Sequence, residues 1–263
     1  MKELRSRSNP RIRRWQRLVR EARMRRSERR AVIEGAHLVI AYLAQGARPL
    51  ALLLSKSGLR HAEVALLAQQ AAIEPVLLPD SLFGTIADTE TPTGIAAEIE
   101  IPVGEERLSE STGCVFMEGI QDSGNVGAIV RSAAAFGVRD VVLGQGCADP
   151  WSPKALRAGM GGHFALRITE AADLSEMMAR FGGRIVCTVV QGGIPVNELD
   201  LRGRIGWIFG SEGRGVSETL AAKAALRAMI PMTAGAESLN VAAAAAICLY
   251  EARRQLSSGG APS

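Results

Sequence analysis

Residues 205–256 read IGWIFGSEGRGVSETLAAKAALRAMIPMTAGAESLNVAAAAAICLYEARRQL, and this segment decides the predicted fold of the chain. It contains two apolar runs with the composition of strands, Ile205–Phe209 and Ala228–Met232. Each run leads into a turn rich in small and polar residues, and each turn opens a helix-like segment. Open α/β sheets hold their ligands at the turns that follow the carboxyl ends of strands. These two turns are therefore the predicted ligand site.

The first turn, Gly210–Gly215 (GSEGRG), contains three glycines, so its backbone can approach a ligand closely. Glu212 lies in the middle of this turn. Its carboxylate would repel a phosphate group, which makes the turn a poor phosphate cradle. A neutral or cationic ligand is expected instead.

The second turn ends in Ser238-Leu239-Asn240 and continues into Val241 and the alanines Ala242–Ala246. Ser238 is the expected N-cap of the helix that follows, and the arginines near its end, Arg253 and Arg254, suit the helix dipole. Helix propensity alone could account for the alanines. We favour a tightly wrapped helix, because a helix with so little side-chain bulk lets other backbone segments pass close to it.

The composition, 47% hydrophobic and 22% charged over 263 residues, is that of a globular protein with one large or two smaller domains. No apolar run approaches the roughly 20 residues that span a bilayer, so no membrane partner is expected. The four cysteines and three histidines are scattered and match no metal-ligand spacing. We therefore expect no disulfide framework, no metal and a reduced, cytoplasmic location.

Charge is distributed unevenly along the chain. Residues 1–30 contain thirteen Lys and Arg against three Glu, a net charge of +10, which leaves −6 for the rest of a chain whose total is +4. A basic segment on an acidic body predicts a polyanionic partner, and we favour nucleic acid. An organelle transit peptide and a solvated basic helix without a partner are the alternatives; Glu3, Glu21 and Glu28 weaken the first of them.

The basic segment itself has the pattern of a helix. The triplet Ser8-Asn9-Pro10 places a cap residue before a proline at the first helical position, and the expected helix covers Arg11–Arg30. Arginines fill most of its faces, where they suit phosphate contacts, so removal of residues 1–30 is expected to weaken nucleic-acid binding and its salt dependence. A narrow apolar stripe is formed by Ile12, Trp15, Leu18 and Val19.

Beyond residue 30, strand-like and helix-like segments alternate. In the first part, strands are expected at Ala31–Glu34, Pro49–Ser55, Pro75–Leu78 and Ile95–Ile99, and helices at His37–Gln45 and His61–Gln70. The stretch Pro102–Thr112 has no apolar period, and it separates a small α/β domain at 1–104 from a second domain at 112–263.

In the second domain, strand-like runs at Cys114–Met117, Asp140–Leu143, Phe164–Ile168 and Arg184–Val190 alternate with helix-like segments, among them Pro153–Gly159 and Leu174–Phe181. This alternation predicts a mainly parallel sheet with helices on both faces, so the expected fold class is α/β.

Three polar patches of the second domain carry the functional signal. They read NVGAIVRSAAAFG (Asn125–Gly137), IFGSEGRGVS (Ile208–Ser217) and IPMTAGAESLNVAAAAA (Ile230–Ala246). Each patch alone has an ordinary explanation as a helix cap, a surface arginine or a solvated loop acid. Their order and spacing together resemble the SpoU (TrmH-like) family of SPOUT RNA 2′-O-ribose methyltransferases. In the first domain, SNPRIRRWQRL and VIEGAHLV are similar to the family's substrate-binding N-terminal domain.

The resemblance implies an N-terminal RNA-binding domain and a SPOUT α/β domain whose last segment, about residues 205–256, is threaded as a trefoil knot. Knots are rare among folds. The resemblance also implies S-adenosylmethionine as the cofactor, whose sulfonium cation is compatible with Glu212, and a homodimer with its site near the interface. Gly210, Ile230 and Leu239 would hold the cofactor, and Thr188 and Met232 would line its pocket. The family's catalytic and substrate-placing positions match Asn125, Arg131, Glu212, Ser238 and Asn240.

The three motifs contain no histidine, so the usual general base is missing. A guanidinium stays protonated in proteins, and Arg131 is therefore expected to bind phosphate and stabilise developing alkoxide charge. Residues 157–163 (RAGMGGH) carry glycines where relatives often have serine or alanine, which leaves their substrate contacts open.

Ribosomal RNA is favoured over transfer RNA as the substrate, by analogy with relatives that carry such an N-terminal domain. The alternative from another class is a non-catalytic RNA-binding or ribosome-assembly factor on the same fold, which would not need to bind the cofactor. A dinucleotide-dependent oxidoreductase is excluded, since no GxGxxG follows an early strand.

Overall fold

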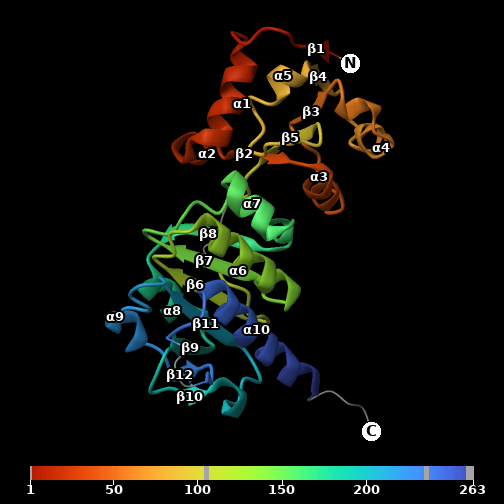
Figure 1. The fold of residues 1–263 in the computed structure, drawn as a ribbon. Helices are drawn as coiled ribbons and strands as arrows, with labels where there is room; N and C mark the ends of the chain where they lie inside the picture. Colours follow the sequence, from red (N-terminus) through yellow and green to blue (C-terminus); the bar gives the residue numbers. More distant parts are fainter. Residues whose placement is uncertain (1, 104–106, 234–236, 259–263) are drawn as a thin grey trace. The chain divides into compact units, whose positions relative to one another are not determined.

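The structure, a computed structural model, describes residues 2–103, 107–233 and 237–258 (Figure 1). Residues 104–106 of the expected linker and 234–236 of the third motif lie outside the described residues. The chain forms two compact units. The first contains residues 1–103 and 149–164, and the second contains residues 104–148 and 165–263. The sequence had placed residues 149–164 in the second domain.

The first unit is built on a five-stranded sheet in the order β1-β4-β3-β5-β2. Neighbouring strands are parallel from β1 to β3, and β5 is antiparallel to both of its neighbours. The strands are β1 (Lys2–Glu3), β2 (Arg30–Glu34), β3 (Ala51–Ser55), β4 (Val76–Leu78) and β5 (Ile95–Glu100). The helices are α1 (Pro10–Arg20), α2 (Ala22–Glu28), α3 (Ala36–Leu43), α4 (Ala62–Gln70), α5 (Asp80–Phe83) and α7 (Pro153–Gly159).

The single helix expected over Arg11–Arg30 is wrong, because the chain breaks at Glu21 into α1 and α2. Glu21 has extended backbone angles, φ −112° and ψ 111°. The break turns α2 back so that the buried Arg25 donates hydrogen bonds to the carbonyl oxygens of Leu18 and Val19, at 2.6 and 2.9 Å. These carbonyls lie in the last turn of α1, where intrahelical donors run out. The expected cap at Asn9 is confirmed, since its side chain accepts from the backbone N–H of Arg11.

The basic segment is part of the core of the first unit. Trp15 is fully buried, and its indole N–H donates to a carboxylate oxygen of Glu98 at 2.7 Å. Arg14 and Arg30 donate to the other oxygen of the same buried carboxylate, each at 2.9 Å. Burial alone would raise the pKa of Glu98, but the bonds from Arg14, Trp15 and Arg30 outweigh it and hold this pKa below its ordinary value. Several of the arginines expected to face phosphate are therefore occupied inside the protein.

Residues 149–164 belong to the first unit because buried contacts hold them there. Asp149 pairs with Arg25 at 2.6 Å, with both side chains buried. Gly161 has φ +85°, and a Cβ at this position would lie 2.6 Å from the Cβ of Ala41 on α3. A glycine in RAGMGGH is thus required by backbone geometry and close packing.

The second unit contains a seven-stranded sheet in the order β10-β12-β9-β11-β6-β7-β8, and all of its strand pairs are parallel. The strands are β6 (Cys114–Glu118), β7 (Asp140–Gly144), β8 (Arg167–Ala172), β9 (Arg184–Val189), β10 (Ile194–Pro195), β11 (Ile205–Gly210) and β12 (Leu226–Met229). The helices are α6 (Ser123–Ala135), α8 (Leu174–Phe181), α9 (Glu218–Ala221) and α10 (Val241–Ser258). The predicted α/β class with a mainly parallel sheet is confirmed.

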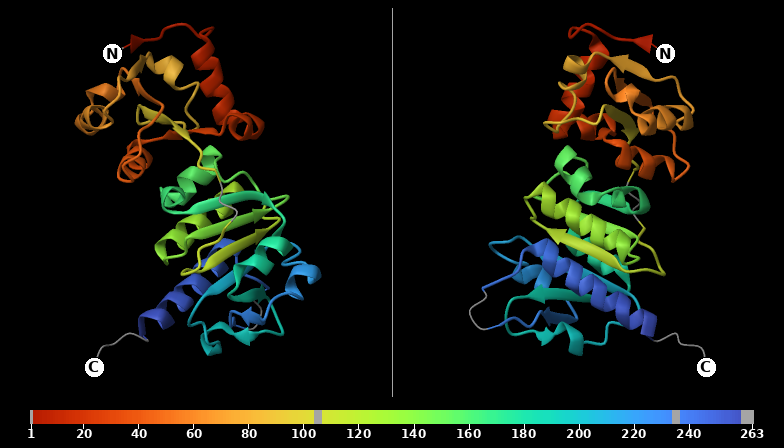
Figure 2. Two further views of the ribbon diagram at one scale, coloured as in Figure 1. Left: turned by 180° about the vertical axis from the view of Figure 1, so that it is seen from behind. Right: turned by 45° about the vertical axis from the view of Figure 1, so that its right-hand side comes forward.

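Helices cover both faces of this sheet (Figure 2). On one face, α8 packs Phe181 and Met177 onto Phe116 and Ile208 of the central strands. On the other, α6 and α10 pack against each other and α10 reaches β11. The trefoil knot implied by the resemblance stays a prediction. Within the described residues, no helix is both long and apolar enough to cross a membrane.

The strand expected at Ala228–Met232 begins two residues earlier and ends three residues earlier, since β12 covers Leu226–Met229. Its last partner on β9 is Val189, where β9 itself ends, and Pro231 has no N–H for further pairing. Ile230 and Met232 consequently belong to the loop after the strand, which frees them to line a cavity.

Candidate active site

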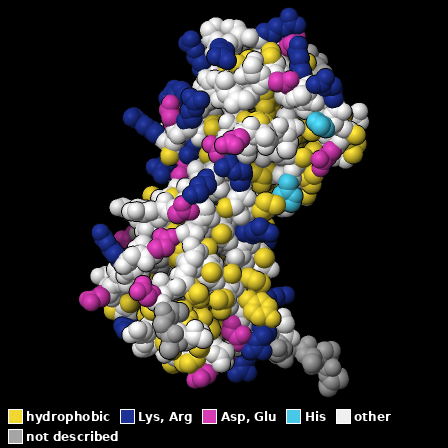
Figure 3. All heavy atoms as spheres, viewed as in Figure 1, with side chains coloured by type: hydrophobic (Ala, Val, Ile, Leu, Met, Phe, Trp, Pro, Cys, Tyr) yellow, Lys and Arg dark blue, Asp and Glu magenta, His cyan; other side chains and the backbone are white. Residues whose placement is uncertain are grey.

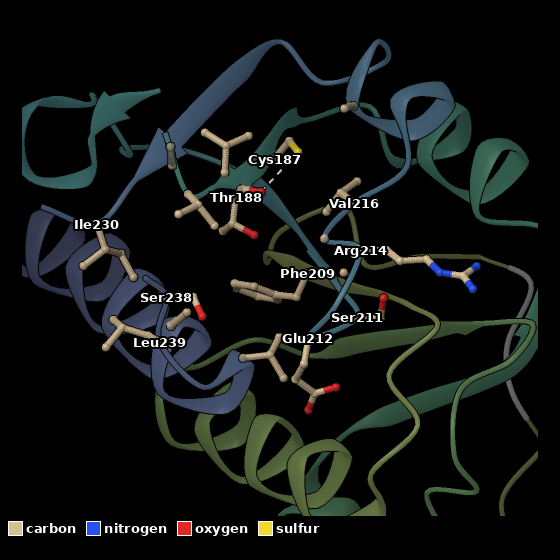
Figure 4. A pocket seen from close by; sticks show the side chains of 18 of the residues that line it. Cys187, Thr188, Phe209, Ser211, Glu212, Arg214, Val216, Ile230, Ser238 and Leu239 are labelled. Carbon is tan, nitrogen blue, oxygen red and sulfur yellow. Dashed lines mark hydrogen bonds between the residues drawn. The ribbon is translucent and has the colours of Figure 1, made fainter. Parts of the chain in front are cut away.

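A cavity of about 480 Å³ lies where β9, β11 and β12 end (Figure 4). These three strands are neighbours in the sheet and run parallel, so their carboxyl ends meet at one edge. The cavity is within the size range of small-molecule sites. The expected ligand site at the two turns after strands therefore coincides with a cavity. All five residues expected to hold the cofactor line it, namely Thr188, Gly210, Ile230, Met232 and Leu239.

The walls of this cavity are largely apolar. Phe209 lies between the labelled side chains of the loop after β12 and those of the loop after β11 (Figure 4). Leu239 also lines the cavity and is 40% exposed. A flat, weakly polar group such as a nucleobase would cover these side chains and remove them from water.

Charged side chains surround the apolar walls. Glu212 and Glu218 supply carboxylates, and Arg214 and Arg227 supply guanidinium groups. Figure 4 shows Arg214 extending away from the other labelled side chains. Both signs of charge at an apolar cavity suit a zwitterionic ligand with an apolar ring, and the carboxylates suit its cationic part.

The turn after β11 is closed by its own backbone. Gly215 donates its N–H to the carbonyl oxygen of Ser211 at 2.8 Å and has φ +67°. A Cβ at Gly210 would lie 2.0 Å from the carbonyl carbon of Gly215. Glycine at 210 and 215 is therefore needed for the turn itself, before any ligand is considered.

Three of the expected catalytic residues form a connected set. Asn240 donates from its side-chain amide to the side-chain oxygen of Asn125 at 3.0 Å, and the amide of Asn125 donates to Glu212. These residues come from the starts of α10 and α6 and from the turn after β11. The set holds the Glu212 carboxylate at the edge of the cavity, which Glu212 also lines.

The expected cap of the alanine-rich helix is wrong. Asn240, and not Ser238, accepts from the first backbone N–H groups of α10, those of Ala242 and Ala243, at 2.9 and 3.3 Å. The helix begins at Val241, so Asn240 is the residue in the capping position. Ser238 instead lines the cavity.

Three of the expected site residues, Asn125, Arg131 and Asn240, lie outside the cavity lining, and of these Arg131 is not bonded to the others. It is exposed on α6, beyond Asn125, and it has no hydrogen-bond or ion-pair partner among the described residues. Its guanidinium is therefore available for a group that this chain does not itself provide.

The structure also adds residues that the sequence reasoning missed. Cys187 lines the cavity, and burial raises the pKa of its thiol. Glu118, the last residue of β6, accepts the backbone N–H of Ser217 at 2.7 Å and so anchors the far end of the turn that carries Glu212. The sequence did carry a signal for Glu118, because it is the polar residue directly after the apolar run Cys114–Met117. Among the described residues, no cluster of three or more His, Cys, Asp or Glu could hold a metal ion.

Sequence comparison assigns a family to both parts of the chain. The profile of the SpoU rRNA Methylase family matches residues 113–250. The profile of the MRM3-like substrate binding domain matches residues 9–97.

Individual proteins resemble nearly the whole chain. It is 32% identical to the Bacillus subtilis 23S rRNA (guanosine(2553)-2′-O)-methyltransferase RlmP, over 96% of this chain and 100% of that protein. A crystal structure of an RNA 2′-O ribose methyltransferase matches with a TM-score of 0.82 and 31% identity, covering 96% of this chain and 98% of that one. A Sinorhizobium meliloti rRNA methyltransferase solved with AdoMet bound matches with a TM-score of 0.83 and 28% identity, covering 97% and 98%.

Proposed function

The chain belongs to the SpoU rRNA methylase family, and from this membership and the geometry of its cavity we propose that it transfers the methyl group of S-adenosylmethionine to a ribose 2′-hydroxyl of ribosomal RNA. The observation that carries the proposal is that residues of the second and third motifs line one cavity at the edge of a parallel sheet, while Asn125 of the first motif donates to Glu212 in its wall. The relative from Bacillus subtilis acts on 23S rRNA, which supports ribosomal over transfer RNA.

The residues of the cavity fit S-adenosylmethionine, which supplies an electrophilic methyl group on a sulfonium cation when it is bound. Ile230, Leu239 and Phe209 provide apolar surface for its adenine ring. Glu212 places a carboxylate where a cationic group is favoured, and Arg227 provides a cation for its carboxylate end. The hydroxyl of Thr188 donates to the carbonyl oxygen of Ile208 at 3.0 Å, so Thr188 stiffens the wall at the end of β9.

The acceptor hydroxyl must lose its proton as the new O–C bond forms. All three histidines, His37, His61 and His163, belong to the first unit, so the second unit contains no imidazole. In the proposed reaction, the carboxylate of Glu212 accepts this proton, with Asn125 fixing its orientation. Arg131 binds the neighbouring phosphate and stabilises the developing alkoxide charge, and Ser238 helps to place the ribose.

A homodimer is part of the proposal. Hydrophobic side chains gather on the surface where α6 and α10 lie (Figure 3), and α10 exposes Ile247 and Tyr250 by 39% and 54%. Phe136, which follows α6, contacts the ring of Tyr250 at 5.9 Å between centroids. A second copy on this surface would cover these groups. Arg131 lies outside the cavity lining of its own chain, and a site completed by a second copy would account for its position.

We assign the reaction to the cytoplasm. The bacterial relative RlmP, which resembles nearly the whole chain, supports this assignment.

Methyl transfer from isotopically labelled S-adenosylmethionine tests the proposed activity. Ribosomal and transfer RNA that lack the modification are the substrates, and nucleoside mass spectrometry locates the label. We expect label on a ribose 2′-oxygen of ribosomal RNA and its loss in Arg131→Ala. Label in transfer RNA alone would replace the substrate assignment. If no label is transferred and the cofactor does not bind, the alternative of a non-catalytic RNA-binding factor is favoured.

A further inference from the structure

A second cavity of about 500 Å³ shares the turn after β11 with the first. The two cavities have only Ser211–Gly215 in common. The second cavity is completed by residues from the end of β6 and the loop before α6, together with the N-cap residue of α9. These are Glu118, Gly119, Gln121 and Ser217. The turn that carries Glu212 is thus a wall between the predicted cofactor cavity and a second space, whose lining residues are all polar, charged or glycine.

Gly213 is part of this wall and lines both cavities. A Cβ built on Gly213 meets no atom within 4 Å, and its φ lies outside the positive range that requires glycine. Neither packing nor backbone geometry within this chain therefore explains a glycine at 213, in contrast to Gly210 and Gly215. Close approach of a ligand to the backbone is a physical reason for it.

The polar groups of the second cavity define the chemistry it accepts. Glu118, Glu212 and Arg214 all line it, so two carboxylates stand against one guanidinium and the balance of charge disfavours a phosphate group inside it. Carboxylates accept N–H and O–H donors, and the amide of Gln121 both donates and accepts. A ribonucleoside offers hydroxyl groups and a base edge that match these groups.

From this arrangement we propose that the second cavity binds the nucleoside of the methyl-accepting nucleotide, with its phosphates outside, and that Gln121 contacts the base. The inference rests on the proposed function, since it places the acceptor across the Glu212 turn from the cofactor. Glu118 has a positioning role here, because it fixes the backbone of Ser217 and with it the turn. Gln121 makes no hydrogen bond to the described residues and lines only the second cavity, so it is the residue to test.

Gln121→Trp fills the second cavity with a bulky ring. Gln191→Trp is its matched control, because Gln191 is an exposed glutamine of the same unit that lines neither cavity. Gln121→Trp is expected to lower kcat/KM for RNA at least about tenfold while the Kd for S-adenosylmethionine changes less than about twofold. Gln191→Trp is expected to match the wild type. An unchanged kcat/KM in Gln121→Trp would overturn the inference and leave the proposed function standing.

Direct binding of nucleosides separates the two proposals further. Guanosine, adenosine, cytidine and uridine are titrated separately, at millimolar concentration, into the full chain, and the side-chain amide signal of Gln121 is followed by NMR. We expect at least one nucleoside to shift this signal in the wild type, and in Gln121→Trp we expect that nucleoside to leave the backbone amide signals of the Ser211–Gly215 turn unshifted. Such a shift would support the site even if no RNA were methylated. No shift with any nucleoside, or binding retained in Gln121→Trp, would refute it.

Discussion

The side-chain amide of Asn240 donates a 3.0 Å hydrogen bond to the side-chain oxygen of Asn125, although the two residues are 115 positions apart. The side-chain amide of Asn125 in turn donates a hydrogen bond to Glu212, which restricts the orientation of that carboxylate. Asn240 is itself fixed, because its side-chain oxygen caps α10. A carboxylate held in this way needs little reorganisation when a substrate arrives. The orientation of Glu212 therefore depends on the first turns of two helices.

Asn240→Asp separates the two roles of Asn240. The variant keeps the oxygen that caps α10 but loses the N–H donor to Asn125, so we expect kcat to fall at least about tenfold with little change in Tm. The Kd for S-adenosylmethionine should change less than about twofold. Single-turnover methyl transfer and calorimetry measure these quantities. Asn240→Ala, which also loses the cap, should lose about 1 kcal/mol of stability in addition. A wild-type rate in Asn240→Asp would show that the connection to Asn125 is not needed.

Arg131→Lys tests whether the planar guanidinium is required. If Arg131 binds a phosphate through two parallel N–H donors, a lysine retains the charge but not the fork. We expect kcat/KM for RNA to fall about tenfold or more in Arg131→Lys and further in Arg131→Ala. Arg139→Lys, another exposed arginine of the second unit, is the control. Near-full activity in Arg131→Lys would rule out a role that depends on the fork.

The dependence of RNA affinity on salt should be carried by the exposed arginines of the basic segment. Arg13, Arg20 and Arg23 are exposed and have no ion-pair partner among the described residues. Replacing each by glutamine should weaken RNA binding and reduce the slope of log K against log salt by up to about 0.9 for each phosphate that is no longer neutralised. Filter binding over a range of salt concentrations measures the slope. An unchanged slope in the triple variant would move the RNA site elsewhere on the protein.

Deleting residues 1–30 would not test the salt dependence alone, because it would also affect folding. Trp15 and Leu18 are fully buried in the first unit, so the deletion would remove part of its core. Arg14→Gln is the informative contrast to the exposed arginines. It removes a donor to the buried Glu98, so it should lower stability more than it changes the salt slope.

His163 should make the first unit less stable in mild acid. Burial lowers the pKa of His163 from 6.5 to about 4, so between these values the unfolded chain binds more protons than the folded one. Stability should therefore rise as pH increases through this window, by up to about 3 kcal/mol.

His163→Gln removes this titration and keeps a donor for the carbonyl oxygen of Pro150, to which the ring nitrogen of His163 is bonded at 2.8 Å. Urea unfolding at several pH values measures the dependence, which should be flatter in the variant. Protonation of Glu98, whose pKa is lowered from 4.5, destabilises the fold only near the lower pH limit of this range. Equal pH dependence in the two proteins would contradict the assignment to His163.

The parallel sheet of the second unit and its ligand edge could be predicted from sequence, because both depend on local patterns. Apolar runs such as Ile205–Phe209 form buried strands wherever helices cover both faces. The resemblance carried by the three motifs named residues that line the cavity, among them Thr188 and Leu239. The roles assigned to these residues stay predictions.

Other features could not be read from local patterns. The break at Glu21 follows from Arg25, whose guanidinium reaches the end of α1 and the distant Asp149. The anchoring of the Glu212 turn by Glu118 joins residues 99 positions apart. Each depends on a side-chain bond between segments that only the fold brings together.

The sequence by itself determined the α/β class, the order of the strands along the chain and the family, because hydrophobic periodicity and motif spacing are properties of neighbouring residues. Only the tertiary structure decided which residues act together. Asn240 caps α10 in place of Ser238, residues 149–164 belong to the first unit, and one turn separates two cavities. The physical reason is that a buried polar group must find a partner wherever the fold offers one, and the distance along the chain does not limit that choice.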